Sequence, residues 1–581
     1  MISMDATYKQ LVHIYDEHTA ATLQRQVLDP TSKYYGGIID ETGIARVNHL
    51  STPNVLAVWA SAIVNPDSRY YHDETLLAAF DKAADFILNR QHADGTISLG
   101  STNYNSPPDT AFVVGGITQI YQLLEAHDWA AVKPSSAKLK LFLERTIPAM
   151  LTGGCHTPNH RWVITAALSL LYEIFQMPEL VARADEWLAE GMDITHDGEW
   201  TERSNGIYNA VSDIALYHTG RVLNRPELLE CVRRNLRMMV YLIHPSGEVV
   251  TDYSGRQDFG QTFDMATYLL IYRLMAAHDK DPLFAAMSDY AGTFIKRAEA
   301  VNNNALLGLL LYPEADISDL ERTPLPDRYV QVINEHHPIN EHLTQIDGVG
   351  HHMRIEHSSM HLAFGAPLVR IRDLDQSVTI MPQTPSFFSL RHGKVRLLGI
   401  KLSTSFSPGI VKFAHLTAEE GVYKLGIVLE KGYNGPIPRQ FLPESAERST
   451  LSPWYLLPHQ HRPMTHLQTL EFQAEITQGD AEWKIRILSD EREDVFTQLS
   501  FIFGDEGTVS GSDLAQDEAG KYFLKSGSMK YAVDEDAIEI STGAYEHLLP
   551  VLREDQHPTG CKYVHVNLVT PFDRTFTVRL L

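Results

Sequence analysis

Apolar residues recur at helical spacing along roughly the first 300 residues. Five segments share one layout, in which a polar or Gly/Pro-containing turn precedes a long and strongly apolar helix. The five helices are predicted to begin near Asn54, Asp109, Asn159, Asn209 and Thr262, at intervals of 55, 50, 50 and 53 residues. More amphipathic helices are predicted between them, within residues 74–91, 136–151, 178–192 and 226–243.

A repeat of this length holds two helices, and such pairs stack because neither helix buries its apolar face alone. The five more apolar helices are therefore predicted to form an inner ring, and their amphipathic partners an outer ring. This arrangement is an incomplete α/α toroid of five or six pairs. All inner helices then begin at the same end, where their first turns converge on one cleft.

From about residue 325 the pattern changes to short alternating runs with more proline, threonine and β-branched residues. Such runs, separated by turn residues, predict a large antiparallel β-sandwich. Its strands are expected within residues 377–390, 394–404, 423–433, 467–477, 483–490, 498–504 and 563–581. The fold class is thus α+β and multidomain. We expect a toroid over residues 1–310, a proline-containing linker over 311–330 and a sandwich over 331–581.

Charge and composition narrow the class of protein. The formal net charge of −24 argues against a nucleic-acid partner, although a local basic pocket could still bind an acidic sugar. No run of eighteen apolar residues predicts a membrane helix, and the first residues hold no apolar core of signal-peptide type. Cys155, Cys231 and Cys561 are far apart and odd in number, which suits a reducing compartment. We therefore expect a monomer or small homo-oligomer with no membrane partner, which is cytoplasmic, or periplasmic or secreted if a leader has been removed.

The toroid places four loops side by side: residues 103–110, 155–162, 200–209 and 251–261. Each loop also has a purely structural interpretation. Asp109, Asn159 and Asn209 could be N-caps that satisfy free amides of the first helical turn, and Glu202 and Arg203 could form a surface ion pair of little energetic value. Separate structural roles do not explain why asparagine, histidine, tyrosine and arginines gather at the same end of successive inner helices.

The segment "DGEWTERSNGIY", residues 197–208, resembles the Asp-Gly…Glu-Arg-Ser…Tyr signature of the heparinase II/III-like and alginate-lyase-like polysaccharide lyases. "NHRW" (159–162) is similar to their upstream Asn-His pair, and "YSGRQ" (253–257) to the arginine-bearing loop of chondroitin and hyaluronan lyases. These families join a toroid to a β-sandwich. Many relatives have histidine after the tyrosine, where this chain has Asn209.

The resemblance implies β-elimination from a uronic-acid-containing polysaccharide or oligosaccharide. The proton at C5 is removed, the oxygen at C4 leaves, and the substrate carboxylate must be neutralised. Tyr208 is the expected proton donor to the leaving oxygen, and His160 is either the base or the neutralising group. Asn159, then Arg203 and Arg256, are the candidates for carboxylate binding, and Glu202 is expected to orient Arg203 or His160. The reaction requires no metal and no organic cofactor.

Further residues are candidates for substrate binding. Seven histidines lie between His336 and His361; they suit a polar loop and strand edge, a substrate contact by His351, His352 or His357, or a structural metal such as zinc. Asp109, Tyr104, Trp162 and Tyr253 suit sugar stacking or hydrogen bonding, although aromatic residues at helix starts are more often part of the core.

Two alternatives belong to other function classes. A glycoside hydrolase on the same toroid would need two carboxylates about 5 to 10 Å apart, for which Asp109 and Glu202 are candidates, with Asp213, Asp258 and Asp264 in reserve. It would leave Tyr208 and the Asn-His pair without a role. A non-catalytic carbohydrate-binding protein would tolerate the loss of the Tyr208 hydroxyl.

Overall fold

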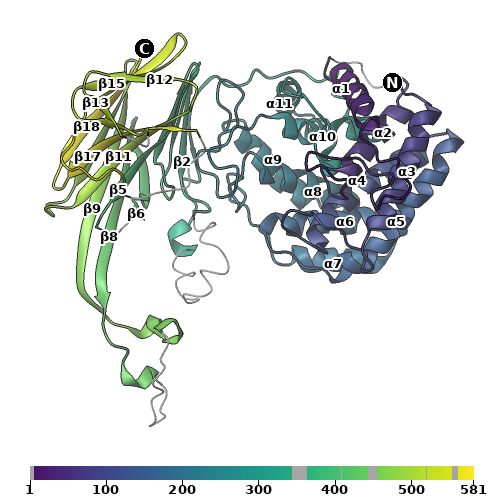
Figure 1. Cartoon of the computed structure of the whole chain (residues 1–581), viewed down its shortest axis with the longest axis horizontal. Coiled ribbons are helices and arrows are strands. Elements are labelled where there is room, and N and C mark those ends of the chain that lie inside the picture. Colours follow the sequence, from purple (N-terminus) through teal and green to yellow (C-terminus); the bar gives the residue numbers. More distant parts are fainter. Residues whose placement is uncertain are drawn as a thin grey trace. The chain divides into compact units, whose positions relative to one another are not determined.

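The chain divides into two units in this computed structural model, which describes residues 6–342, 363–406, 409–419, 421–442, 454–517, 520–552 and 560–581 (Figure 1). The first unit comprises Met1–Leu242, Gly247–Val249 and Thr262–Pro326, and the second comprises Ile243–Ser246, Val250–Gln261 and Asp327–Leu581. The loop Val250–Gln261, which precedes the fifth predicted inner helix, thus belongs to the second unit.

The first unit is a ring of helices within a second ring. Its inner helices are α2 (Thr52–Val64), α4 (Pro107–Ala126), α6 (Pro158–Phe175), α8 (Tyr208–Leu223), α10 (Leu269–Asp279) and α12 (Ala305–Leu311). Each contacts the next, and α12 contacts α2, which closes the ring. The outer helices are α1 (Ala6–Leu23), α3 (Glu74–Arg90), α5 (Lys133–Thr152), α7 (Pro178–Leu188), α9 (Pro226–Met239) and α11 (Pro282–Gly292). The predicted α/α toroid is confirmed.

The burial pattern follows the composition of each helix. Every residue of α2 is buried, whereas α9 buries one face and presents its arginines on the other. An apolar side chain on the outside of an inner helix packs against the outer ring, so such a helix is apolar all round. Proline in the first turn of α2, α4 and α6 fixes where each helix begins, because proline has no N–H to leave unsatisfied there.

Two details of the helical prediction differ from the structure. The fifth inner helix was expected near Thr262 but begins at Leu269, after a 3-10 turn over Ala266–Tyr268. The residues before this turn are not helical, and among them the carbonyl of Phe263 accepts a hydrogen bond from Val249 N–H. The sixth inner helix, α12, is too short for its apolar run to show a helical period.

The second unit contains two antiparallel-dominated sheets among the described residues. The first follows the order β1-β2-β3-β4-β5-β11-β17-β14-β13, with β6 paired to β5. Its strands are β1 (Arg328–Ile333), β2 (Leu368–Asp373), β3 (Gln376–Ile380), β4 (Phe388–His392), β5 (Val395–Thr404), β6 (Gly409–Ile410), β11 (Phe496–Phe503), β13 (Leu514–Gln516), β14 (Tyr522–Leu524) and β17 (Lys562–Val569).

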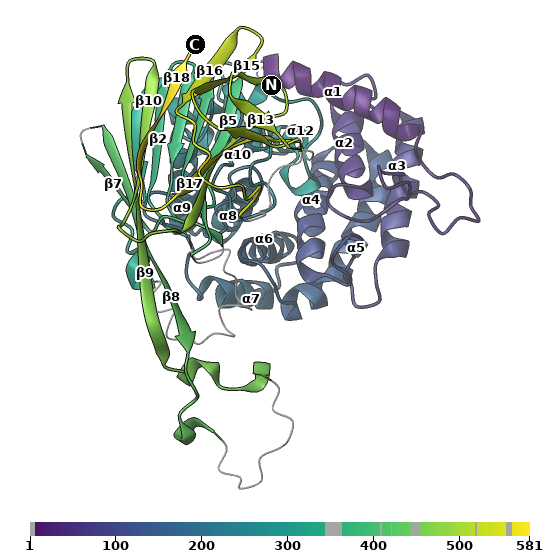
Figure 2. The ribbon, with the colours of Figure 1, turned by 60° about the vertical axis from the view of Figure 1, so that its left-hand side comes forward.

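The second sheet follows the order β12-β15-β16-β18-β10-β9-β8-β7. Its strands are β7 (His415–Glu419), β8 (Val422–Asn434), β9 (Met464–Gly479), β10 (Glu482–Ser489), β12 (Thr508–Gly511), β15 (Ser528–Val533), β16 (Asp536–Ser541) and β18 (Asp573–Leu580). β8 and β9 form a long hairpin (Figure 2). One apolar core takes side chains from both sheets, as in Leu390, Leu499, Phe472 and Ile485. The predicted β-sandwich is confirmed.

A buried ionic cluster holds the 250–261 loop within the second unit. The carboxylate of Asp252 accepts hydrogen bonds from Arg391 (3.1 Å) and Ser389 (2.7 Å), and lies 3.6 Å from Nε2 of His244. Burial raises the pKa of Asp252, but Arg391, His244 and Ser389 together lower it further, so the pKa lies well below its ordinary value. Asp252 is therefore ionised at neutral pH, and its charge is neutralised inside the fold.

Across the described residues, no helix combines the length and apolar composition that crossing a bilayer requires. The apolar helices of the first unit are instead the inner members of the toroid.

Replacing Gly116 by alanine should destabilise the first unit. A Cβ at this position would stand 2.2 Å from Cγ2 of Val301 and 2.7 Å from its carbonyl carbon. We expect a loss of about 1–3 kcal/mol in the free energy of unfolding, despite the higher helix propensity of alanine. Gly115→Ala is the control, since its Cβ would meet only Asn302 at 3.3 Å. Urea unfolding of both variants checks this, and equal midpoints would contradict it.

Replacing Asp252 by asparagine should destabilise the second unit by about 3–5 kcal/mol, because the buried Arg391 loses its charged partner. Asp573→Asn, which breaks an exposed pair with Arg486, should cost less than about 1 kcal/mol. The Asp252 contribution is fully present above its unfolded pKa near 4 and is lost progressively as pH falls from that value through the folded-state pKa, which lies well below it. The difference in the free energy of unfolding between the wild type and Asp252→Asn should therefore be smaller at pH 3 than at pH 7 without vanishing; an unchanged difference would argue against this charge pairing.

Candidate active site

Three of the four predicted loops lead into neighbouring inner helices of the first unit, α4, α6 and α8. Their N-caps are Ser106, Thr157 and Ile207. Asp109, Asn159 and Asn209 therefore lie inside the first turn, and the N-cap interpretation of these three residues is wrong. Their side chains are left for contacts other than capping.

Glu202 joins the loop before α8 to the start of α6. Its Oε2 accepts hydrogen bonds from the backbone N–H of Asn159 (3.1 Å) and from the Asn159 side-chain amide (2.7 Å). Both residues are buried. The second amide hydrogen of Asn159 points to Oγ1 of Thr157 at 3.2 Å, the longer and weaker of the two side-chain bonds. To donate to a substrate carboxylate, Asn159 would have to release Thr157 rather than Glu202.

His160 follows Asn159 and lies in a row of rings. It meets His156 edge-on at 4.7 Å and Phe112 edge-on at 6.4 Å between centroids, and Phe112 stacks on His49 at 4.8 Å. Burial lowers the pKa of His49 to about 4, against the opposing effect of Asp109. His49 is therefore neutral at pH 7. The row links the starts of α2, α4 and α6.

Arg203 forms an ion pair with Glu199, with Nε 3.1 Å from Oε1, and both side chains are 1% exposed. The carboxylate of Glu202, which is predicted to orient Arg203 or His160, accepts hydrogen bonds from Asn159. Arg203 has a φ of +50°, and its N–H donates to the carbonyl of Trp200. This backbone turn points the two neighbouring side chains to different partners.

Tyr208 is the first residue of α8 and is half-buried. Its N–H donates to Oγ of Ser204 (3.2 Å), whose carbonyl accepts from Asn209 N–H (2.9 Å). The Asn209 side-chain amide donates a hydrogen bond to the Asn205 side chain (2.9 Å). The backbone carbonyl of Asn205 accepts one from the hydroxyl of Tyr268, in the 3-10 turn that precedes α10 (2.6 Å). The backbone that carries the phenol is thus fixed from both α8 and α10.

A second buried carboxyl group supports the same loop. Oδ1 of Asp213 accepts a hydrogen bond from the Trp200 indole at 3.0 Å. Burial raises the pKa of Asp213 well above its ordinary value, with only the Trp200 bond opposing it. Asp213 therefore fixes the loop and is sealed from substrate, which removes it as a hydrolase carboxylate. Neither Glu199 nor the Trp200–Asp213 bond was identified from the sequence.

The remaining candidates differ in accessibility. Asp109 accepts hydrogen bonds from Ser106 and Asn103 of its own loop. Tyr104 is 70% exposed, whereas Trp162 and Tyr253 are 1% exposed and present no face to a sugar in this conformation. Trp162 packs instead against Trp200, with Arg161 over its ring.

Arg256 and Tyr253 belong to the second unit, together with the rest of the 250–261 loop. Burial lowers the pKa of the Arg256 guanidinium, while Asp258 opposes that change. Asp258 also accepts a hydrogen bond from Ser254, which in turn accepts one from the Arg256 N–H. His351, His352 and His357 lie outside the described residues.

No group of three or more His, Cys, Asp or Glu side chains among the described residues is arranged to bind a metal ion. The polar groups at the helix starts are an imidazole, an amide, a phenol and carboxylates. Together they offer proton transfer and hydrogen bonding.

No known family model and no curated protein matches this sequence. Solved structures do match its fold. A chondroitin AC lyase of Streptomyces coelicolor A3, in complex with chondroitin sulphate, is 11% identical, with a TM-score of 0.52 over 99% of this chain and 80% of that one. Heparinase III is 12% identical, with a TM-score of 0.53 over 100% and 85% of the two chains.

A Paenibacillus xanthan lyase is 9% identical, with a TM-score of 0.53, and the match spans 99% of this chain but only 57% of that one. All three are polysaccharide lyases, and at these identities the likeness concerns the fold. The chain thus has the fold of the polysaccharide lyases that join a helical toroid to a β-sandwich.

Proposed function

We propose that this chain is a polysaccharide lyase that cleaves a uronic-acid-containing glycan by β-elimination. The observation that carries the proposal is the Glu202–Asn159 link, which holds the loop bearing Tyr208 against the helix start bearing His160. The shared fold supports it, as does the fact that one of the similar lyases was solved with an acidic polysaccharide.

The reaction needs a base at C5 and an acid at the leaving oxygen. The C5 proton goes to the base, the C5–H electrons form the C4–C5 double bond, and the C4–O bond breaks as its oxygen takes a proton. A tyrosine titrates ordinarily near pH 10, so Tyr208 carries the proton that the leaving oxygen requires. His160 serves as base, or binds the carboxylate while Tyr208 performs both transfers.

The other residues act on these groups or on the substrate carboxylate. The Asn159 amide binds the carboxylate and stabilises the enolate-like intermediate. Glu202 is a positioning residue, because it fixes Asn159 and touches no reacting atom in this scheme. Arg203 is likewise a positioning residue through its buried pair with Glu199, and Arg256 is a further cation for the substrate.

Tyr208→Phe should lower turnover by about 10²–10⁴-fold, because the phenol supplies a proton transfer. The assay is ultraviolet absorbance of the 4,5-unsaturated uronate formed from a panel of acidic polysaccharides and oligosaccharides. Tyr217→Phe, in the buried part of the same helix, is the matched control and should retain activity. New reducing ends without ultraviolet absorbance would instead identify a hydrolase.

Glu202→Ala should reduce turnover by about 10²-fold, since Asn159 loses the acceptor that fixes it. Glu202→Gln should recover part of the loss because its carbonyl oxygen still accepts a hydrogen bond from Asn159. The control is Glu186→Ala, which removes a surface carboxylate of α7. Initial rates with the same absorbance assay decide the matter; a glutamine variant no better than the alanine variant would count against positioning by this hydrogen bond.

A further inference from the structure

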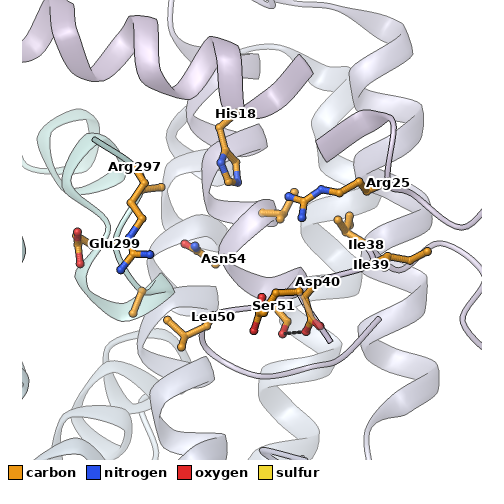
Figure 3. Close-up of a pocket in the computed structure, with 14 residues that line it drawn as sticks. His18, Arg25, Ile38, Ile39, Asp40, Leu50, Ser51, Asn54, Arg297 and Glu299 are labelled. Atoms are coloured by element: carbon orange, nitrogen blue, oxygen red, sulfur yellow. Dashed lines mark hydrogen bonds between the residues drawn. The ribbon is translucent and has the colours of Figure 1, made fainter. Parts of the chain in front are cut away.

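A cavity of about 290 Å³ lies in the first unit, away from the candidate catalytic residues (Figure 3). It is lined by α1, by the 38–41 segment, by the start of α2 and by residues 297–300. This volume is at the lower end of the roughly 300–1,000 Å³ typical of small-molecule pockets, which suits one sugar unit. No role has been given to its residues so far.

Two arginines make the cavity attractive to an anion. Arg25 and Arg297 are exposed, and neither has a carboxylate within ion-pair distance among the described residues. Figure 3 shows their guanidinium groups on either side of Asn54. Guanidinium groups bind carboxylates with charge-assisted hydrogen bonds. Both arginines are available for this, since neither forms a salt bridge with a carboxylate of the described residues.

The carboxylates of the cavity do not cancel this attraction. Asp40 is already paired, accepting hydrogen bonds from Arg46 (2.7 Å) and Ser51 (2.7 Å), and Glu41, the other acidic residue of this segment, lies 3.3 Å from Arg46. Burial raises the pKa of Glu299, with Asp264 adding to this effect and Arg297 opposing it. A raised pKa weakens the preference of this carboxyl group for its charged form.

The cavity also contains hydrogen-bond acceptors that lack donors. Asn54 is 7% exposed, and its buried Oδ1 has no hydrogen-bond partner among the described residues. Nε2 of His18 is buried without a partner as well, and burial, with Arg25, lowers the pKa of this ring. A buried acceptor without a donor is costly, and sugar hydroxyls are donors of the required kind. The two arginines match the carboxylate of a sugar acid and the unpaired acceptors match its hydroxyl groups, whereas a simple anion would satisfy the arginines alone.

The row of rings described above connects this cavity to the candidate active site. Leu50 and Ser51 line the cavity, and their neighbour His49 stacks on Phe112, which meets His160. The cavity thus lies at the start of α2, and His160 lies at the start of α6, two inner helices further round the ring.

We propose that this cavity is a subsite for a uronate unit next to the reacting part of the glycan. Arg25 and Arg297 bind its carboxylate, and Asn54 accepts a hydrogen bond from one of its hydroxyl groups. This assignment rests on the proposed lyase function, because it assumes an acidic glycan as substrate.

The test is titration of the full chain with D-glucuronate, D-galacturonate and D-mannuronate, followed by saturation-transfer NMR. The neutral sugars glucose, galactose and mannose are the ligand controls. We expect at least one uronate to bind, and its neutral counterpart not to bind at the same concentration. An Arg25→Met/Arg297→Met double variant should bind that uronate at least tenfold more weakly. Arg145→Met, which removes an exposed α5 arginine, should bind it as the wild type does.

The proposal is overturned if no uronate binds at millimolar concentration, if a neutral sugar binds equally well, or if the double variant binds like the wild type. Thermal unfolding checks that the double variant is folded, which its two exposed side chains lead us to expect. An Asn54→Ala variant is the second probe and should weaken uronate binding while leaving the arginines in place; unchanged affinity in this variant would remove Asn54 from the subsite.

Repeating the titration with Tyr208→Phe separates this proposal from the lyase function. If the wild-type chain forms no unsaturated product from any glycan, while uronate binding is seen both in the wild type and in Tyr208→Phe, the subsite stands and the lyase function is refuted. Elimination with an unchanged KM in the double variant would refute the subsite alone. Where both hold, the double variant should raise KM tenfold or more with little change in kcat, because the subsite binds substrate and transition state equally.

Discussion

Two hydrogen bonds to one buried carboxylate connect the parts of the candidate active site. The Glu202 side chain, on the loop before α8, accepts hydrogen bonds from the backbone N–H and from the side-chain amide of Asn159 at the start of α6. A toroid brings helix starts to one end, but it does not by itself fix the loops that precede them. Breaking this link would leave a buried carboxylate short of donors, which is costly. The loop and the helix start therefore keep one relative position.

The fold was predictable to the extent that it depends on periodicity. The period of about fifty residues was sufficient to predict the toroid, because each repeat is a helix pair that must bury its apolar faces against the neighbouring pairs. α12 escaped notice because seven residues hold fewer than two helical turns. Individual strands such as β5 and β10 were recognisable from their alternation. The strand order was not, because β5 pairs with β11 across some ninety residues of sequence and nothing local encodes that choice.

The candidate site was predictable in its residue types but not in its pairings. Adjacent Glu202 and Arg203 suggest an ion pair in sequence, yet the positive φ of Arg203 separates them, and Arg203 pairs with Glu199 instead. The aromatic character of Trp162 suggested sugar stacking, but as the fifth residue of the inner helix α6 it is buried in the core. The identity of a residue indicates which interactions its side chain can form, whereas the local backbone conformation determines which neighbouring residue it contacts.

The distribution of charge shows why an acidic chain is compatible with an acidic substrate. The formal net charge of −24 is a property of the whole sequence, and at physiological salt an exposed charge is largely screened beyond about 8 Å. What a sugar carboxylate meets is therefore decided by the few side chains within that distance. At the start of α2 these include two arginines without carboxylate partners in the described chain and an aspartate already neutralised by Arg46. The surface keeps the protein negatively charged, and the local groups determine what it binds.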